Sequence, residues 1–334
     1  MLKKLYVIFV FTLVNQFFIL ASILSDDIKT FYKDLPVLVT GGAGFIGSHI
    51  VTKLVELGAH VTILDDLSSG DESNIKNIED KIIFIEGSIT DFQVCLEATK
   101  NKKIIFHLAA FISVPDSMHK PYLCHLNNDV GTLNILEAAR MNNVDRVIFS
   151  SSCAVYGTPA KEKCSEVDVC SPESAYGYSK YIGEQYMKEY AKFFNVNTVV
   201  LRYFNVYGNR QNPNGAYAAV VAKFTDLMKK NEPVIIYGDG LQTRDFVSVG
   251  QVVRANLFFG SCKNIESIKG EIFNIATGES INLLELFDSL KKQFPEYQHN
   301  PIFMPARVGD VKHISADVMK YDAFKSSYDC QNNK

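Results

Sequence analysis

Residues 36–50 read PVLVTGGAGFIGSHI, and this stretch decides the fold. The aliphatic run Val37 to Val39 is long enough for one buried strand, and it stops abruptly at Thr40 and two glycines. Beyond the glycines, apolar residues recur at helical spacing as far as Gly58, which ends the pattern. The stretch therefore predicts a strand, a tight turn and a helix.

Each glycine in this turn has a physical task. One permits the turn, one lets a phosphate approach the backbone, and one lets the helix pack closely on the strand. The free N–H groups at the start of the helix then face the anion. A glycine pattern alone is a weak signal, because it also occurs by chance in unrelated loops.

The next strand strengthens the interpretation. Residues 60–64 form a second aliphatic run that ends at Asp65, 18 residues beyond Gly47. A carboxylate at about this spacing accepts hydrogen bonds from the adenosine ribose of NAD, and it repels the extra phosphate of NADP. The sequence therefore predicts NAD as the cofactor.

The composition is that of an ordinary globular protein. The 334 residues are 47% apolar and 21% charged, so one large domain or two smaller ones can bury a sizeable core. A net charge of −3 gives no electrostatic case for binding nucleic acid. The seven cysteines are scattered and form no CxxC pair, which favours reduced thiols and predicts no metal site.

The N-terminal residues 1–34 differ from the rest. Two lysines precede a mostly apolar stretch over residues 5–24, and an α-helix of that length spans about 30 Å. The positive-inside rule would then export the remaining chain, which conflicts with a cofactor that is chiefly intracellular. We expect a cytoplasmic enzyme with an apolar leader that contacts the membrane at most. A single-pass membrane anchor stays open as the alternative.

Further strands alternate with helices along the chain. Aliphatic runs predict strands at 81–86, 104–108 and 146–150, and an amphipathic pattern predicts a helix at 127–141. This alternation predicts an α/β protein with a Rossmann-like, doubly wound parallel sheet. We expect an NAD-binding domain at 35–200, to which about 245–262 return, and a smaller α/β substrate domain at 201–334.

Two stretches carry candidate catalytic residues. Residues 149–157 read FSSSCAVYG, a strand that runs into hydroxyl groups at its C-terminal end, where open α/β sheets bind ligands. Residues 171–180 read SPESAYGYSK, which predicts a helix capped by Ser171 with Pro172 in its first turn. Tyr176 and Lys180 then lie one turn apart on the same helix face.

A tyrosine with its ordinary pKa of about 10 is a poor base at neutral pH. The ammonium group of Lys180 and the positive charge of a nicotinamide would favour the phenolate of Tyr176. Ser152 can donate a hydrogen bond to the reacting oxygen and hold it between the tyrosine and the cofactor. These three residues are the candidate catalytic group.

Together these motifs resemble the extended short-chain dehydrogenase/reductase family, and within it the nucleotide-sugar 4-epimerases. The resemblance covers residues 37–317 and includes LRYFNVYG at 201–208, HLAA at 107–110 and SVP at 113–115. Residues 211–220, QNPNGAYAAV, are similar to the version found in UDP-N-acetylglucosamine 4-epimerases.

The resemblance implies that Tyr176 deprotonates the sugar 4-hydroxyl while hydride leaves C4 for NAD. The 4-keto sugar then turns over and takes the hydride back on its other face. By resemblance, NAD binding is assigned to Gly41, Gly44, Phe45, Ile46, Gly47, Asp65, Ser88, Ile89, Ala109, Tyr176 and Lys180. The UDP-sugar is assigned to Ser152, Asn205, Tyr237, Arg244, Arg307 and Asp310, with Ile314 as the gate that admits or excludes N-acetylated sugars.

Several positions depart from the family pattern. Ser88 replaces a carboxylate that usually contacts adenine, and Ile314 is intermediate between the small residue that admits N-acetyl groups and the tyrosine that excludes them. The chain also ends soon after Asp317, where relatives continue into a closing helix. We expect this shorter end to cost packing and stability.

Other activities of the same fold remain alternatives. A nucleotide-sugar 4,6-dehydratase needs an Asp-Glu pair after the catalytic Ser or Thr, and a decarboxylase typically has Glu nearby. Cys153 and Ala154 occupy these places, which disfavours both reactions. A non-catalytic NAD-bound scaffold is the third alternative. The resemblance also implies a homodimer formed through two helices of each subunit, with Tyr181, Ile182, Tyr186 and Met187 as the apolar face.

Overall fold

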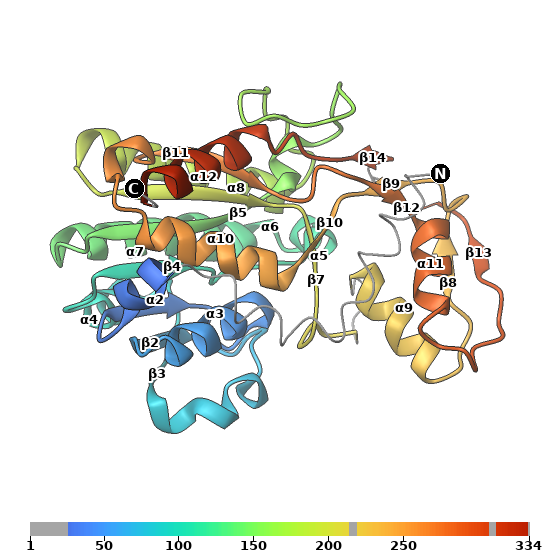
Figure 1. Cartoon of the computed structure of the whole chain (residues 1–334), viewed down its shortest axis with the longest axis horizontal. Helices are drawn as coiled ribbons and strands as arrows, with labels where there is room; N and C mark the ends of the chain where they lie inside the picture. Colours follow the sequence, from blue (N-terminus) through green and yellow to red (C-terminus); the bar gives the residue numbers. More distant parts are fainter. Residues whose placement is uncertain (1–25, 214–218, 307–311, 333–334) are drawn as a thin grey trace.

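The computed structural model describes residues 26–213, 219–306 and 312–332, and Figure 1 shows the whole chain. A seven-stranded parallel sheet in the order β11-β6-β5-β4-β1-β2-β3 lies at its centre. These strands are β1 (Pro36–Thr40), β2 (His60–Asp65), β3 (Ile82–Glu86), β4 (Ile104–His107), β5 (Arg146–Ser152), β6 (Thr198–Tyr203) and β11 (Glu271–Ile275). The predicted doubly wound parallel sheet is confirmed.

Helices cover both faces of the large sheet and enclose two hydrophobic cores (Figure 1). One core contains Ile50, Leu54 and Phe259, and the other contains Leu136 and Met187. The helices on the first face are α2 (Asp26–Tyr32), α3 (Phe45–Glu56), α10 (Val249–Ser261) and α12 (Met319–Asn332). Those on the second face are α4 (Phe92–Thr99), α7 (Gly131–Met141) and α8 (Ala175–Phe193).

A smaller lobe lies at the right of Figure 1 and has a core of its own around Phe224, Leu286 and Tyr297. Its helices are α9 (Val220–Lys229) and α11 (Leu283–Lys291). The short strands that form this lobe and join it to the large sheet are β7 (Asn205–Tyr207), β8 (Ile235–Tyr237), β9 (Thr243–Arg244), β10 (Phe246–Ser248), β12 (Ile281–Asn282), β13 (Ile302–Met304) and β14 (His313–Ile314). Short helices elsewhere are α5 (Val114–His119), α6 (Pro121–His125), η2 (Glu72–Asn74), η3 (Lys76–Lys81), η5 (Cys153–Tyr156) and η6 (Ile265–Ser267).

Two predicted helices begin at other residues than expected. The N-cap of α8 is Ser174, whose hydroxyl accepts a hydrogen bond from Gly177 N, and not Ser171. Residues 171–173 stay outside the helix, and the Glu173 carboxylate accepts hydrogen bonds from Thr158 instead. The helix predicted at 127–141 is divided into a π-helical turn, η4 (Leu126–Val130), and α7. Such turns are frequent at functional sites.

The first described residues belong to the folded domain. Ile28 and Tyr32 of α2 are buried, and the Tyr32 hydroxyl donates to the Leu257 carbonyl at 2.8 Å. Residues 26–32, which lie inside the leader predicted at 1–34, therefore pack against the NAD-binding domain. Within the described ranges, no helix is both long and apolar enough to cross a bilayer. The apolar stretch 5–24 lies outside them.

The residues after Asp317 form a helix that packs on the large sheet, and the predicted cost in stability relative to longer relatives stays a prediction. After Asp317, α12 lies on β11 and α10. The Phe324 ring lies 6.0 Å from Phe258, 5.9 Å from Phe259 and 5.6 Å from Phe273, centroid to centroid. Aromatic contacts of this kind stabilise a core beyond their buried area.

We expect Phe324→Ala to lower the free energy of unfolding by about 2–3 kcal/mol, less than for a fully buried phenylalanine because the ring is half-buried. Urea unfolding followed by circular dichroism measures this change. Met319→Ala is the matched control, because Met319 lies on the same helix and is 72% exposed. Equal stability of the two variants would contradict the assigned role of α12.

Candidate active site

The glycine turn after β1 has the close contacts that its sequence predicted. Gly41 has a φ of +69°, and a Cβ there would lie 2.7 Å from Ala109 N. A Cβ on Gly47 would lie 2.1 Å from the Gly41 carbonyl oxygen. Gly41 thus makes the turn and Gly47 lets α3 pack against it, which no residue with a side chain could do.

Asp65 stands at the end of β2, against this turn. Its side chain accepts hydrogen bonds from Ala43 N and Leu67 N, both at 2.9 Å, and burial raises its pKa. A Cβ on Gly70 would lie 2.9 Å from one carboxylate oxygen. The carboxylate therefore also anchors the glycine turn, a role that the sequence analysis missed.

The predicted adenine-side residues follow β3. The Ser88 hydroxyl lies 2.9 Å from the Thr90 hydroxyl, and Ile89 is buried. Asn134 of α7 donates to the Ile89 carbonyl at 2.9 Å, which fixes this loop on the helix. The carboxyl ends of β1, β2, β3 and β4 thus gather the predicted cofactor residues at one edge, as a dinucleotide site requires.

The three candidate catalytic residues meet where β5 ends against α8. Ser152 is the last residue of β5, and its side chain acts on the Tyr176 phenol and lowers its pKa. Lys180 is 4% exposed and donates to the Ser150 carbonyl at 2.9 Å. Its ammonium nitrogen lies 5.9 Å from the centre of the Tyr176 ring. The structure therefore brings Ser152, Tyr176 and Lys180 together.

Burial governs the pKa of both titratable groups. It raises the pKa of Tyr176 to about 12, against the opposing effect of Ser152. Burial also lowers the pKa of Lys180 to about 8. The predicted effect on the phenol combines the charges of Lys180 and a nicotinamide, so it stays a prediction.

A hydrogen-bonded cluster behind Tyr176 was not predicted. The Ser117 hydroxyl accepts from Tyr176 N at 3.1 Å. The side-chain oxygen of Asn128, in η4, accepts a hydrogen bond from Phe111 N, and its side-chain nitrogen donates to the Phe111 carbonyl. The same nitrogen donates to the Ser179 hydroxyl at 2.8 Å. The π-helical turn therefore joins the loop after β4 to α8. The sequence held one signal of this cluster, the two adjacent polar residues Asn127 and Asn128 at the start of the helix predicted at 127–141.

A buried ion pair supports the other side of the site. Arg202 of β6 donates to both oxygens of Glu184 on α8, at 2.8 and 2.6 Å, and both side chains are at most 2% exposed. The Ser151 hydroxyl donates to the same carboxylate at 2.6 Å. Glu184 lies one turn beyond Lys180, so this pair fixes α8 against the end of β5. Sequence alone could not pair these residues.

Three predicted substrate residues lie close together at the smaller lobe. Arg244 on β9 is paired in register with Ile314 on β14. Asn205 on β7 donates from its backbone N to the carbonyl of Asp245, the residue after Arg244, at 3.0 Å. The positive charge of Arg244 also acts on Cys153, just beyond Ser152, which links this group to the catalytic strand.

Of the three remaining predicted substrate residues, the structure describes only Tyr237. Tyr237 ends β8 and accepts a hydrogen bond at its carbonyl from Gln242 at 2.6 Å. Arg307 and Asp310 lie outside the described residues. Their predicted roles stay predictions.

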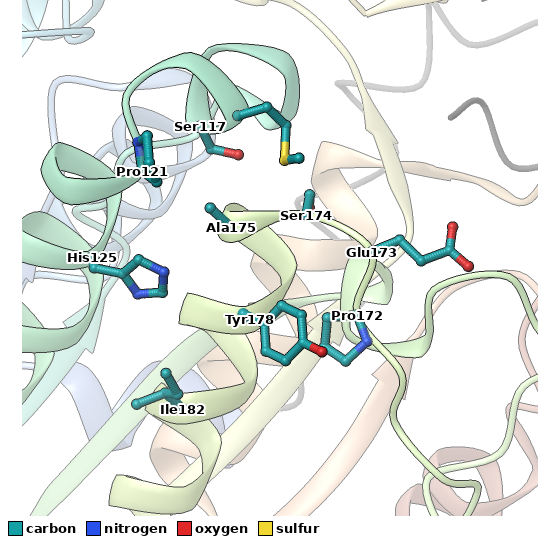
Figure 2. Close-up of a pocket in the computed structure, with 10 residues that line it drawn as sticks. Ser117, Pro121, His125, Pro172, Glu173, Ser174, Ala175, Tyr178 and Ile182 are labelled. Carbon is teal, nitrogen blue, oxygen red and sulfur yellow. The ribbon is translucent and has the colours of Figure 1, made fainter. Parts of the chain in front are cut away.

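A separate surface pocket of about 590 Å³ lies on the outer side of α8 (Figure 2). Figure 2 shows Tyr178 and Ile182 of α8 in this pocket with Pro121 and His125 of α6. Because residues two apart on a helix point roughly 200° apart, Tyr178 faces away from Tyr176. The pocket is thus distinct from the candidate active site.

The cofactor residues fit NAD. The turn around Gly41 is a cradle that a Cβ would fill, and among the described side chains none caps the N-terminus of α3 at Gly44. Free N–H groups at a helix N-terminus bind pyrophosphate. Asp65, at the end of β2, is placed for the adenosine ribose. Tyr176 and Lys180 of α8 lie beside the carboxyl end of β5. When bound, NAD supplies the hydride acceptor.

Comparison with known proteins agrees with this site. The model of the NAD dependent epimerase/dehydratase family matches residues 37–276. A protein of Methanocaldococcus jannaschii, provisionally named UDP-glucose 4-epimerase, is 43% identical over 86% of this chain and 91% of its own length. The UDP-glucose 4-epimerase of Mycolicibacterium smegmatis is 38% identical over 84% of this chain and 89% of its own length.

Solved structures are similar as well. The UDP-N-acetylglucosamine 4-epimerase of Methanobrevibacter ruminantium, in complex with UDP-N-acetylmuramic acid, is 38% identical with a TM-score of 0.82 and covers 87% of this chain and 91% of its own. The chain therefore belongs to the NAD dependent epimerase/dehydratase family. It is an NAD-dependent enzyme of the extended short-chain dehydrogenase/reductase type, in the group of UDP-sugar 4-epimerases.

The pKa of Lys180 predicts a pH-dependent stability. Lysine in an unfolded chain has a pKa of about 10.4, so between pH 8 and 10.4 the unfolded chain binds more protons than the folded one and stability rises with pH. Lys180→Met lacks this titration. We expect the stability of the parent relative to this variant to rise by about 2 kcal/mol between pH 7 and 9.5.

Urea unfolding of nucleotide-free protein at the two pH values measures the difference. A difference that stays constant with pH would show that Lys180 keeps an ordinary pKa.

Proposed function

We propose that this protein interconverts the C4 epimers of a UDP-hexose, with UDP-N-acetylglucosamine and UDP-N-acetylgalactosamine as the preferred pair and UDP-glucose and UDP-galactose as further substrates. The observation that carries the proposal is the Tyr176 phenol, which lies beside Ser152 and Lys180 at the edge of the sheet that also carries the glycine turn. The reaction class follows from the relatives, whose names are those of UDP-sugar 4-epimerases.

The chain's own residues divide the work. Tyr176 removes the proton of the sugar 4-hydroxyl, and Ser152 donates to the same oxygen. The pKa of about 12 for Tyr176 means that the phenol stays protonated until further positive charge reaches it. Lys180, held by the Ser150 carbonyl, keeps its ammonium group beside the Tyr176 ring. Since hydride leaves and returns to C4, no net oxidation occurs.

The smaller lobe holds the nucleotide in this proposal. We assign the diphosphate to Arg244 and Arg307, because guanidinium groups bind phosphate in bidentate fashion. Asn205 contacts the diphosphate-sugar, Tyr237 stacks on the uracil and Asp310 contacts its ribose. Binding energy at the nucleotide then retains the keto sugar while it turns over. The domain division into residues 35–200, 245–262 and the remainder is part of the same proposal.

The preference for N-acetylated sugars rests on Ile314. This residue is 5% exposed and packs with Phe204 and Tyr156, beside Arg244 in register. A side chain drawn into the core leaves more room than a tyrosine would. The Methanobrevibacter ruminantium relative, named for UDP-N-acetylglucosamine, supports the same preference.

Elimination and decarboxylation fit less well. Burial raises the pKa of Cys153 to about 12, so this thiol stays neutral, and Ala154 has no proton to transfer. Neither residue can replace the acid pair of a 4,6-dehydratase. A curated relative is a UDP-N-acetyl-alpha-D-glucosaminuronate decarboxylase, 34% identical over 75% of this chain, so that reaction is tested alongside.

A homodimer belongs to the proposal. Exposed apolar side chains gather on α5, α6 and the outer side of α8, with Tyr122 at 79%, Met118 at 58% and Tyr178 at 52%. The pocket of Figure 2 lies among them. Met187, predicted on this face, is instead fully buried in the core.

We propose a cytoplasmic enzyme, because NAD is chiefly intracellular.

The activity is tested with purified protein and UDP-N-acetylglucosamine, UDP-glucose and UDP-glucuronate, with products identified by NMR. We expect 4-epimers of the first two, with faster turnover of the N-acetylated sugar. Tyr176→Phe should lower kcat by about 10²- to 10⁴-fold, because the proton acceptor is lost. Tyr178→Phe, the same change on the opposite helix face, should keep the parent rate.

A 4-keto-6-deoxy product or release of CO₂ would replace the proposed reaction by dehydration or decarboxylation. Inert protein that retains NAD would indicate a scaffold.

The dimer is tested by sedimentation velocity. The double change Met118→Lys and Tyr122→Lys should convert a dimer into a monomer at micromolar concentration, because charges would be buried unpaired at the interface. Phe303→Lys, at a 52% exposed site of the smaller lobe, should leave the dimer intact. A monomeric parent would disprove the proposed assembly.

A further inference from the structure

Asp245 is fully buried and lies between β9 and β10, where the chain passes from the smaller lobe toward α10. Its carboxylate accepts four hydrogen bonds. One oxygen accepts from Thr277 N at 2.9 Å and from the Thr277 hydroxyl at 2.6 Å. The other accepts from Gly278 N at 2.9 Å and from Ala316 N at 3.3 Å. The sequence analysis gave this residue no role.

These partners come from separate parts of the chain. Thr277 and Gly278 follow β11 of the large sheet, while Ala316 follows β14 of the smaller lobe. The backbone carbonyl of Asp245 accepts two further bonds from Asn205, at 3.0 Å from its backbone N and 3.2 Å from its side-chain nitrogen. One residue therefore connects four segments.

The connected segments carry the predicted substrate residues. Arg244 immediately precedes Asp245, Asn205 is bonded to its carbonyl, and Ile314 lies two residues before Ala316. Because Asp245 itself is 0% exposed, its carboxylate cannot contact a substrate in the candidate active site. Any effect on substrate must pass through these neighbours.

The carboxylate form matters chemically. An ionised aspartate only accepts hydrogen bonds, and here it meets four donors. An asparagine would turn an NH₂ group toward backbone N–H donors, which leaves buried donors without a partner. Burying the charge is costly, and the four donors that surround the carboxylate offset this cost only while they keep their positions.

We propose that Asp245 is the positioning residue that sets the distances between Asn205, Arg244 and Ile314, and thereby the affinity for the nucleotide diphosphate and the fit of the sugar. The inference deepens the proposed function and rests on its assignment of these three residues. A purely structural role would instead lower stability, cofactor content and turnover together.

The test compares UDP affinity by calorimetry, steady-state kinetics, bound NAD content and melting temperature. For Asp245→Asn we expect the Kd for UDP and the KM for the UDP-sugar to rise about tenfold or more, with kcat within about threefold and NAD content unchanged. Thr277→Val keeps the backbone bond to Asp245, removes the hydroxyl bonds to Asp245 and to the Glu279 backbone, and should raise the same two constants several-fold. Thr277→Ser should restore them.

Thr99→Val is the matched control. Thr99 is fully buried, whereas Thr277 is half-buried; the Thr99 hydroxyl donates to the Cys95 carbonyl at 2.9 Å, and the residue lies on α4, away from the smaller lobe. It should lower the melting temperature without changing the Kd for UDP. If Asp245→Asn does not fold, Thr277→Val and Thr277→Ser decide the matter.

The inference is overturned if Thr277→Val binds UDP as tightly as the parent, or if its only effect is the lower melting temperature seen in Thr99→Val. A parent that binds UDP but epimerises no UDP-hexose would overturn the proposed function alone, since the UDP affinities of the variants still test Asp245. A parent that does not bind UDP would overturn both.

Discussion

The bond from the Lys180 ammonium group to the Ser150 carbonyl is the constraint on which the active site depends. It ties α8 to the end of the strand β5. Lys180 lies one helical turn from Tyr176, and Ser150 lies two residues before Ser152. The Glu184–Arg202 pair and the Ser151 hydroxyl repeat this connection on the next turn of the helix. Because the strand and the helix are joined twice, the phenol and the serine hydroxyl are held together before substrate binds, which is what orientation of a reacting group requires.

Buried carboxylates serve the same purpose elsewhere in the molecule. Asp65 accepts two backbone N–H bonds and holds the glycine turn, and Asp245 accepts four and holds the substrate segments. In both places a loop crosses the carboxyl edge of the sheet, where regular strand bonds have ended. A buried acceptor with several lone pairs satisfies the donors that such loops leave unpaired. The enzyme thus fixes its loops with charges that never contact solvent freely.

Most of the fold could be predicted from local sequence, and the supports of the site could not. The aliphatic runs gave every strand from β1 to β5 within two residues, and the Tyr176–Lys180 spacing gave the helix face. The Ser171 cap failed because Ser174 competes for the same helix and Glu173 has a partner outside it. Glu184, Arg202, Asn128 and Asp245 make contacts between segments far apart in the chain, and no periodicity encodes such pairs. The pKa of the Tyr176 phenol also depends on desolvation, which is set by packing and is not encoded in the local sequence.

The central claim is that a hydrogen leaves C4 of the sugar as hydride, stays within the site and returns to the same carbon. UDP-N-acetylglucosamine carrying deuterium at C4, incubated with the enzyme in ordinary water and analysed by NMR and mass spectrometry, tests it most directly. The account predicts that both epimers retain the deuterium at C4 at equilibrium. Replacement of the deuterium by solvent hydrogen would contradict it, because it would mean that C4 exchanges a proton with water and does not lend a hydride.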